Sequence, residues 1–378
     1  MPSASELLPA LPWLVPFASL LRLASNRPNL SDAAPAAGTL VSVVVPARNE
    51  SATIETVVTS VLASTYQPLE LLVVDDRSTD DTAAIVARLA EAGGRLRLVA
   101  GEPLPDGWYG KPWACLQGYR AARGDILLFT DADTRHEPEL LARAVGALRS
   151  ASADLLTVAP WQRCETFWER VVMPQIWLLL GVRYHPSRVN RARRARDVID
   201  NGQFILVPRE SYEAVGTHEV VRHEVAEDLA LAQAFHQAGR RVHFAFAERL
   251  METRMYRSLP HLIEGWSKNV YLGGRRSFPD EPALRALVPA MLLAAFLFWL
   301  VPPVALAAAA AAGRLAPAAA AATILSALFW MLISYGMKIP PWYGLLYPLG
   351  ALMGAYITAR STWRGSRRVE WRGRTYLD

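Results

Sequence analysis

The first half of the chain alternates short, almost wholly apolar runs with segments whose apolar residues recur at helical spacing. Runs rich in Val, Leu and Ile, typical of strands buried on both faces, lie within residues 40–50, 69–76, 95–102 and 125–134. Helical spacing follows in 51–64, 82–94, 113–124 and 137–150. Strands that alternate with helices predict an α/β fold, with right-handed βαβ units on a mostly parallel sheet and helices on both faces.

The carboxyl-terminal third has a different pattern, with long apolar runs in residues 283–360. Three segments, 287–312, 316–337 and 340–358, approach or exceed the ~20 residues that span a bilayer. Near the amino terminus, Leu7–Leu23 lacks a basic start and a clear cleavage site and contains three prolines. It is therefore interpreted as a retained anchor or interfacial segment rather than a signal peptide. The predicted parts are 1–30, 38–282, 283–360 and a basic tail, 361–378.

Charge and cysteine content narrow the class of protein. The net charge of +5 is modest for 378 residues, and we expect no nucleic-acid partner. Two cysteines at positions 115 and 164 cannot build a disulfide framework, which favours a reducing compartment. No G-x-G-x-x-G follows the first predicted strand, which argues against a dinucleotide-binding oxidoreductase. Of the 40 Lys and Arg residues only Lys111, Lys268 and Lys338 are lysines.

Polar side chains follow three of the predicted strands, at the edge where ligands bind in parallel sheets. They are Asn49, Glu50, Asp75, Asp76, Asp131 and Asp133. Asp131 and Asp133, one residue apart, repel each other, and burying them unpaired costs several kcal/mol. Mg²⁺ or Mn²⁺ would remove that cost and keep positions open for phosphate oxygens. The alternative is that Asp133 caps the following turn and Asp131 is solvated.

The motifs together resemble a family 2 glycosyltransferase with a nucleotide-diphosphosugar (GT-A) fold. Those that carry the resemblance, between Val41 and Trp266, are VSVVVPARNE, VVDDRSTDDT, GKPWACLQG, LLFTDADT, the Gly202-Gln203 turn and VAEDLALA. The apolar carboxyl third and the tail VEWRGRTYL resemble the membrane-bound branch that acts on carotenoid, hopanoid or sphingolipid-type acceptors.

The resemblance implies roles for individual residues. Asp131 and Asp133 are the expected metal ligands, and Asp228 is the expected general base with Glu227 in support. The remaining residues expected at the nucleotide-sugar donor are Pro46, Ala47, Glu50, Asp75, Asp76, Lys111, Gln203 and Trp266, together with Asp131.

Simpler interpretations stand beside these roles. Asp76 would instead cap a turn with Ser78 and Thr79, and Lys111 would be a solvated loop lysine. Glu227 and Asp228 would only complement the positive end of a helix, worth a few tenths of a kcal/mol to ~1. The family's Q-x-x-R-W motif is also altered, since Gly265 precedes Trp266 where arginine is expected; Lys268 or Arg257 is the suggested replacement.

The expected activity is inverting hexosyl transfer from a nucleotide-diphosphate sugar, UDP-sugar being the expected donor, to a hydroxyl of a membrane lipid. Transfer to polyprenyl phosphate, processive polysaccharide synthesis and a catalytically silent scaffold are the alternatives. The expected location is the inner membrane, multi-pass, with a cytoplasmic catalytic domain. Tail arginines favour a cytoplasmic tail, so the number of crossings must be even. We interpret one apolar segment as re-entrant or interfacial, the first being suggested by its Pro302-Pro303 break.

Overall fold

The computed structural model describes residues 3–25, 27–365, 369–371 and 374–376. The chain divides into two compact units. The unit that holds most of the predicted catalytic domain, here called the catalytic unit, comprises residues 27–163, 186–255 and 368–378. The other, here called the helical unit, comprises residues 1–26, 164–185 and 256–367. Residues 164–185 and 256–282, which the sequence assigned to the catalytic domain, therefore cluster with the helices of the second unit.

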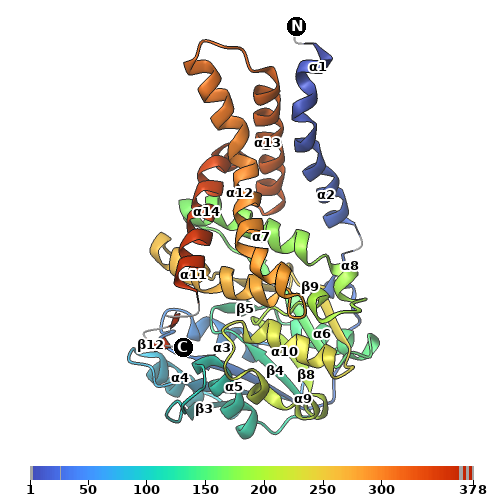
Figure 1. Cartoon of the computed structure of the whole chain (residues 1–378). Helices are drawn as coiled ribbons and strands as arrows, with labels where there is room; N and C mark the ends of the chain where they lie inside the picture. The colour runs from blue at the N-terminus through green and yellow to red at the C-terminus, as the bar shows by residue number, and fades with distance from the viewer. Residues whose placement is uncertain (1–2, 26, 366–368, 372–373, 377–378) are drawn as a thin grey trace. The chain divides into compact units, whose positions relative to one another are not determined.

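The catalytic unit is built on a seven-stranded sheet with strand order β3-β2-β1-β4-β8-β6-β9 (Figure 1). β1, β2, β3 and β4 are mutually parallel, whereas β8 runs antiparallel to both β4 and β6. The strands are β1 Val41–Ala47, β2 Leu69–Asp75, β3 Leu96–Ala100, β4 Ile126–Thr130, β6 Leu155–Ala159, β8 Phe204–Pro208 and β9 Val242–Phe246. A smaller sheet holds β5 Thr134–His136, β7 Trp161–Gln162 and β10 Met251–Thr253.

Helices cover both faces of the large sheet, as the buried strands predict. The alternation of β1 sends Val43 and Val45 to one core and Val44 to the other. The first core packs against α3 Ile54–Leu62, α4 Thr82–Glu91 and α6 Leu140–Ser150, and the second against α5 Gly110–Ala121, α9 Arg209–Val215 and α10 Glu227–Gln237. The shorter elements are η2 Leu30–Asp32, α8 Pro186–Val189, η3 Ala195–Asp197, η4 Thr217–Val221, β11 Val369–Trp371 and β12 Arg374–Tyr376. The predicted α/β architecture with a mostly parallel sheet is confirmed.

The helical unit contains the apolar segments. Its elements are α1 Ala4–Leu7, η1 Leu8–Leu14, α2 Val15–Ala24, α7 Phe167–Arg183, α11 Leu259–Arg276, α12 Pro282–Ala311, α13 Pro317–Gly336, η5 Pro341–Leu346 and α14 Tyr347–Arg364. Within the described residues, α12 and α13 are the two helices long and apolar enough to cross a membrane. An aromatic cluster of Phe296, Trp299, Phe329 and Trp330 packs between them.

Two expectations about the membrane region change. α12 continues through Pro302 and Pro303, so the break predicted there is wrong; the third apolar segment is the divided one, split between η5 and α14. Arg360 and Arg364 each pair with Glu264, at 2.9 and 2.5 Å. Their contribution to the positive tail is therefore partly neutralised. Arg367, Arg368 and Arg372 lie outside the described residues.

Candidate active site

The carboxyl ends of the parallel strands gather the candidate side chains at one edge of the large sheet. β4 ends at Thr130, directly before Asp131. Because β8 is antiparallel to β4, with Phe204 paired to Thr130, the turn that precedes β8 lies at this same edge. Gly202 and Gln203 form that turn. The site is thus assembled from the end of one strand and the beginning of its neighbour.

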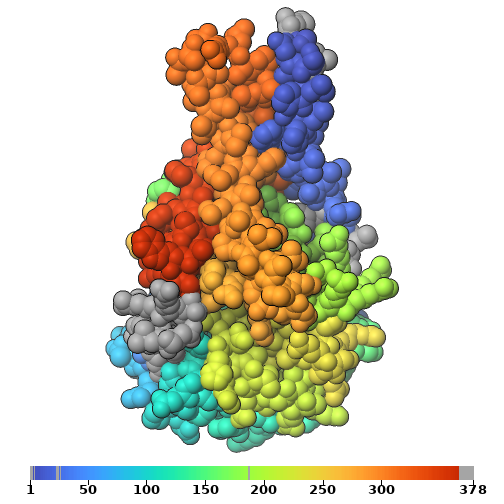
Figure 2. Space-filling model, viewed as in Figure 1, coloured from blue at the N-terminus to red at the C-terminus, as the bar shows by residue number. Residues whose placement is uncertain are grey.

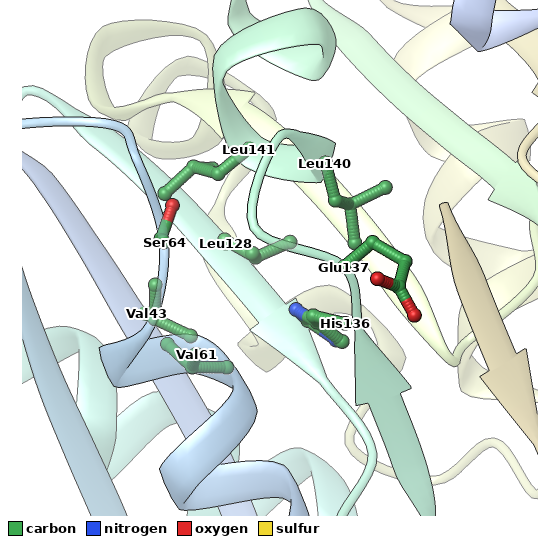
Figure 3. Close-up of a pocket in the computed structure, with 8 residues that line it drawn as sticks. All are labelled: Val43, Val61, Ser64, Leu128, His136, Glu137, Leu140 and Leu141. Atoms are coloured by element: carbon green, nitrogen blue, oxygen red, sulfur yellow. The ribbon is translucent and has the colours of Figure 1, made fainter. Parts of the chain in front are cut away.

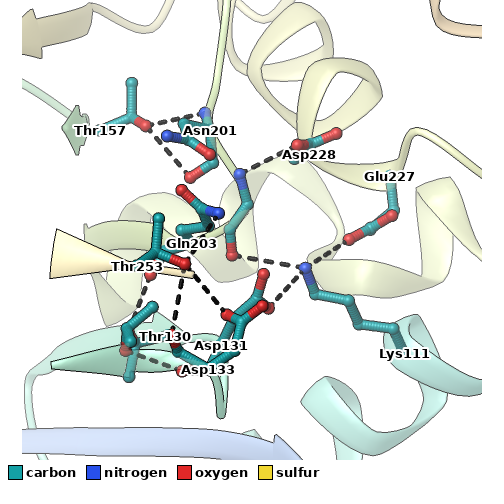
Figure 4. Close-up of polar contacts among 12 residues, drawn as sticks. Lys111, Thr130, Asp131, Asp133, Thr157, Asn201, Gln203, Glu227, Asp228 and Thr253 are labelled. Carbon is teal, nitrogen blue, oxygen red and sulfur yellow. Dashed lines mark hydrogen bonds and ion pairs between the residues drawn. The ribbon is translucent and has the colours of Figure 1, made fainter. Parts of the chain in front are cut away.

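Lys111, in the first turn of α5, joins this edge to the start of α10 (Figure 4). Its ammonium lies 2.8 Å from Asp131 Oδ1 and 2.9 Å from Glu227 Oε1, and it donates at 3.4 Å to the carbonyl of Gly202. We call Lys111, Asp131, Gly202, Glu227 and Asp228 the acid–lysine cluster. Lys111 is therefore not the solvated loop lysine of the simpler interpretation, and Asp131 is not a solvated acid.

Asp228 accepts two backbone hydrogen bonds, from the N–H of Gly202 at 2.9 Å and from its neighbour Leu229 at 2.7 Å. Gly202 leaves no room for a side chain, because a Cβ there would lie 2.8 Å from Lys111 Nζ and 3.0 Å from Asp228 Oδ2. Glycine thus lets backbone atoms reach the carboxylate and the ammonium together. At the start of α10, Glu227 contacts Lys111, whereas Asp228 accepts from the Gly202 and Leu229 N–H groups.

Burial and charge set the protonation of the acid–lysine cluster. Burial and the nearby charge of Glu227 raise the pKa of Asp228 to about 6, against the lowering effects of Lys111 and of the Leu229 and Gly202 N–H groups. Burial alone would lower the pKa of Lys111, but the charges of Asp131, Glu227 and Asp228 hold that pKa well above its usual range. Asp228 is consequently a carboxylate at neutral pH that still binds a proton readily, as a general base requires.

Asp200 is a buried acid that the sequence reasoning missed. Neither of its oxygens has a hydrogen bond in the described part of the chain. Burial, followed by the charge of Asp228, raises the pKa of Asp200 well above its usual range, although the nearby Thr157 hydroxyl and Asn201 N–H favour the ionised form. The buried carboxyl of Asp200 therefore holds a proton more readily than an ordinary aspartate does. An acid before Asn-Gly is typical of a turn, and no signal in the sequence distinguished it.

Asp133 is supported from the smaller sheet. Its Oδ1 accepts a hydrogen bond from Thr253 Oγ1 at 3.4 Å, and the same hydroxyl accepts one from Gln203 Nε2 at 3.4 Å. Gln203 is buried, and Thr253 links it to Asp133 (Figure 4). The N-cap residue of the following helix, α6, is Glu139.

The residues expected around the nucleotide lie at the ends of β1 and β2. Pro46 and Ala47 pair with Val74 and Asp75 across the two strands. Asp75 Oδ2 accepts from the Ser78 N–H at 3.3 Å, so Asp75 takes part in capping this turn.

One acceptor at this end of the sheet is left for a ligand. Asp75 Oδ1 is buried without a hydrogen-bond partner among the residues described. Asp76 is buried, and its N–H donates to the carbonyl of Ala47 at 2.8 Å. Glu50 accepts from the Thr53 hydroxyl at 3.0 Å.

Trp266 belongs to the other unit. It is buried in α11, where its Nε1 lies 3.3 Å from Met173 Sδ and its ring packs near Trp177 and Tyr256. Gly265 packs directly on the Tyr256 ring, and any Cβ there would collide with it. An arginine at position 265 is therefore incompatible with the packing of Tyr256, which explains the altered Q-x-x-R-W motif.

A small pocket elsewhere in the catalytic unit carries no candidate chemistry. It lies against the first core and is lined mainly by apolar side chains, with His136 beside them (Figure 3). His136 Nε2 is within hydrogen-bonding distance of the hydroxyls of Thr130 and Thr134, at 3.1 and 3.2 Å. Burial lowers the pKa of His136 to about 3, so the ring is neutral and supports the end of β4.

Comparisons with known proteins bear on the family and the fold of this chain. Residues 42–216 match the family model described as Glycosyl transferase family 2. A 4,4'-diaponeurosporenoate glycosyltransferase of Staphylococcus aureus (strain MRSA252) is 24% identical over 351 residues, which cover 89% of this chain and 88% of that protein. The solved mannosyltransferase PcManGT from Pyrobaculum calidifontis, in complex with GDP-Man and Mn²⁺, has a TM-score of 0.58 at 24% identity and covers 96% of this chain and 95% of its own. The predicted GT-A-type fold is confirmed.

Proposed function

We propose that this chain, whose residues 42–216 match the Glycosyl transferase family 2 model, is a member of that family and moves a sugar from a nucleotide-diphosphate donor to a membrane lipid of the carotenoid type. The proposed chemistry rests on one observation. In the acid–lysine cluster, Lys111 contacts Asp131, the first acid of the D-x-D, and also Glu227, at the start of the helix that bears Asp228. Similarity to a carotenoid glycosyltransferase over 89% of the chain supports the lipid acceptor. The proposed location is a membrane, with α12 and α13 crossing it and the catalytic unit on the cytoplasmic side.

The proposed reaction is a single displacement with inversion. Asp228 takes the proton of the acceptor hydroxyl, and the hydroxyl oxygen forms a bond to the anomeric carbon. The bond from that carbon to the nucleotide diphosphate breaks, and the diphosphate leaves with the electron pair. Glu227 orients Lys111, whose ammonium is a point charge suited to phosphate oxygens.

The D-x-D fits a divalent cation that shares its coordination with the donor. Asp131 and Asp133 present hard carboxylate oxygens, the ligands that Mg²⁺ and Mn²⁺ prefer. Within the described residues no group of three or more His, Cys, Asp or Glu side chains could hold a metal ion. The remaining positions would therefore be filled by phosphate oxygens and water. When bound, the cation supplies positive charge to the departing diphosphate.

Transfer is tested with the purified full chain in lipid vesicles that contain carotenoid acceptors and Mn²⁺. Radiolabelled UDP-glucose and GDP-mannose are supplied separately, and label in the extracted lipid is counted. We expect label in the carotenoid fraction with one of the donors and none after the metal is chelated. Label confined to polyprenyl phosphate, or hydrolysis of the donor without lipid labelling, would contradict the proposed acceptor.

The pH dependence of kcat/KM should follow Asp228. Because the base must be ionised to accept a proton, the rate should rise with pH through about 6, the pKa of Asp228, and level off above it. Glu227→Gln removes a charge that raises this pKa and should move the rising limb to lower pH. The prediction is checked by measuring kcat/KM of the unmodified chain and of Glu227→Gln between pH 4.5 and 8.5. If the rising limb of the pH profile is the same in both, the charge of Glu227 does not set the pKa of Asp228.

A further inference from the structure

Lys111 is bound as a cation would be bound at the D-x-D. Its three N–H groups have three acceptors: Asp131 Oδ1 at 2.8 Å, Glu227 Oε1 at 2.9 Å and the carbonyl of Gly202 at 3.4 Å. The side chains of Lys111 and Asp131 are 22% and 27% exposed, and that of Glu227 only 9%. Contacts between opposite charges are stronger in such a partly buried site than in bulk water.

The position of Lys111 in its helix makes a purely local explanation weak. It lies in the first turn of α5, where the helix dipole disfavours a positive charge. The acids that the ammonium faces favour its positive charge there. Without the ammonium, Asp131, Glu227 and Asp228 would repel one another. Lys111 thus offsets the repulsion that a metal at the D-x-D would also offset.

We propose that Lys111 is a placeholder cation that competes directly with the divalent metal for Asp131. This inference rests on the proposed function, which places the metal at Asp131 and Asp133. A divalent ion on either oxygen of Asp131 would stand beside the ammonium, and the two like charges would repel. Metal binding therefore requires Lys111 to release Asp131, while its contact with Glu227 can remain.

The nucleotide diphosphate provides the new partner for the released ammonium. Lysine has a flexible four-carbon stem and accepts phosphate oxygens as readily as carboxylates. A donor that brings its diphosphate to the edge of the sheet thus supplies acceptors for Lys111 and ligands for the metal in the same step. Metal and donor consequently bind together, and the metal alone binds weakly.

The test is Mn²⁺ binding to the full chain in detergent without any nucleotide, measured from the electron paramagnetic resonance signal of free Mn²⁺. Lys111→Met should tighten the dissociation constant at least about tenfold, since Asp131 is freed. Lys338→Met, in the turn after α13, removes the same charge far along the chain and should leave the constant unchanged. Lys111→Met leaves buried Glu227 without this partner, so Lys111→Met/Glu227→Gln is measured as well in case the single variant is unstable.

A double-mutant cycle with Asp131→Asn separates direct competition from general repulsion. If Lys111 and the metal compete directly for Asp131, Lys111→Met should no longer raise the Mn²⁺ affinity once Asp131 has been replaced by asparagine. This holds whether the Asp131→Asn chain binds Mn²⁺ weakly or not measurably. A gain that persists there, or an affinity of Lys111→Met within twofold of the unmodified chain, overturns the inference. Sugar transfer by the unmodified chain is measured separately, so that its absence counts against the proposed function and the Mn²⁺ result against the placeholder alone.

Discussion

Replacing Asp228 with asparagine is expected to lower kcat about 10²–10⁴-fold, the usual contribution of a general base. The amide has the size of the carboxylate and can still accept the Gly202 N–H, which lies 2.9 Å from Asp228 Oδ2. It cannot take a proton from the acceptor hydroxyl. The nucleotide sugar is proposed to bind at Asp131 and Lys111, so donor affinity should change by no more than a few fold.

Two measurements make this result specific to proton transfer. Both oxygens of Asp228 accept an N–H, so the amide nitrogen of asparagine must face one of these donors, at a cost of about 1–3 kcal/mol. Thermal unfolding is therefore recorded for each variant. Asp125→Asn, at an exposed residue directly before β4, is the matched control and should retain full activity. Turnover of Asp228→Asn within tenfold of the unmodified chain would remove Asp228 from its role.

The sheet of the catalytic unit could be predicted because its strands are buried on both faces. A run such as Val41–Ala47 has few alternatives, and its alternation places Val43 and Val44 in opposite cores. The carboxyl ends of such strands then locate the site without knowledge of side-chain geometry. For the same reason the position of Asp131 and Asp133 at this edge could be predicted from the sequence, whereas Asp228 at the start of α10 was expected from the family resemblance.

The division of the chain into units could not be predicted in this way. α11 contains polar and charged residues as well as apolar ones, as a helix of a globular domain does, and α7, although more aromatic and apolar, lies within the segment assigned to that domain. Their assignment to the helical unit depends on contacts distant in sequence, such as the hydrogen bond from Trp266 Nε1 to Met173 Sδ. The glycine at position 265 also could not be explained from the sequence, because the Tyr256 ring packs on it and leaves no room for a side chain.

The details of the site were also beyond the sequence. That Lys111 would contact an acid from β4 and another from α10 requires the three elements to be placed in space. The raised pKa of Asp200 follows from its burial, and the close approach of Gly202 to both Lys111 and Asp228 follows from packing at distances below 4 Å. A pattern of residue types gives the chemistry available at a sheet edge, and only coordinates give the pairing.

Removing both acids of the D-x-D, by Asp131→Ala and Asp133→Ala together, is expected to reduce sugar transfer at least about 10²–10³-fold, as loss of preorganised charge at a reacting group does. Nucleotide-sugar binding should be lost as well, because the proposed metal no longer links the diphosphate to the protein. Folding should be preserved, since Lys111 keeps Glu227 as a partner at 2.9 Å and the repulsion between the two aspartates disappears. The variant thus separates donor binding from stability.

Titration calorimetry with UDP and GDP in the presence of Mn²⁺ checks this prediction, and thermal unfolding is followed in parallel. Asp106→Asn, an exposed acid in the loop before α5, is the matched control and should bind nucleotide normally. Chelation of the metal from the unmodified chain should reproduce the loss seen in the double variant, since both remove the same link to the diphosphate. If the double variant bound nucleotide as tightly as the unmodified chain while chelation abolished binding, the metal would be held by other residues, and the assignment of Asp131 and Asp133 would be wrong.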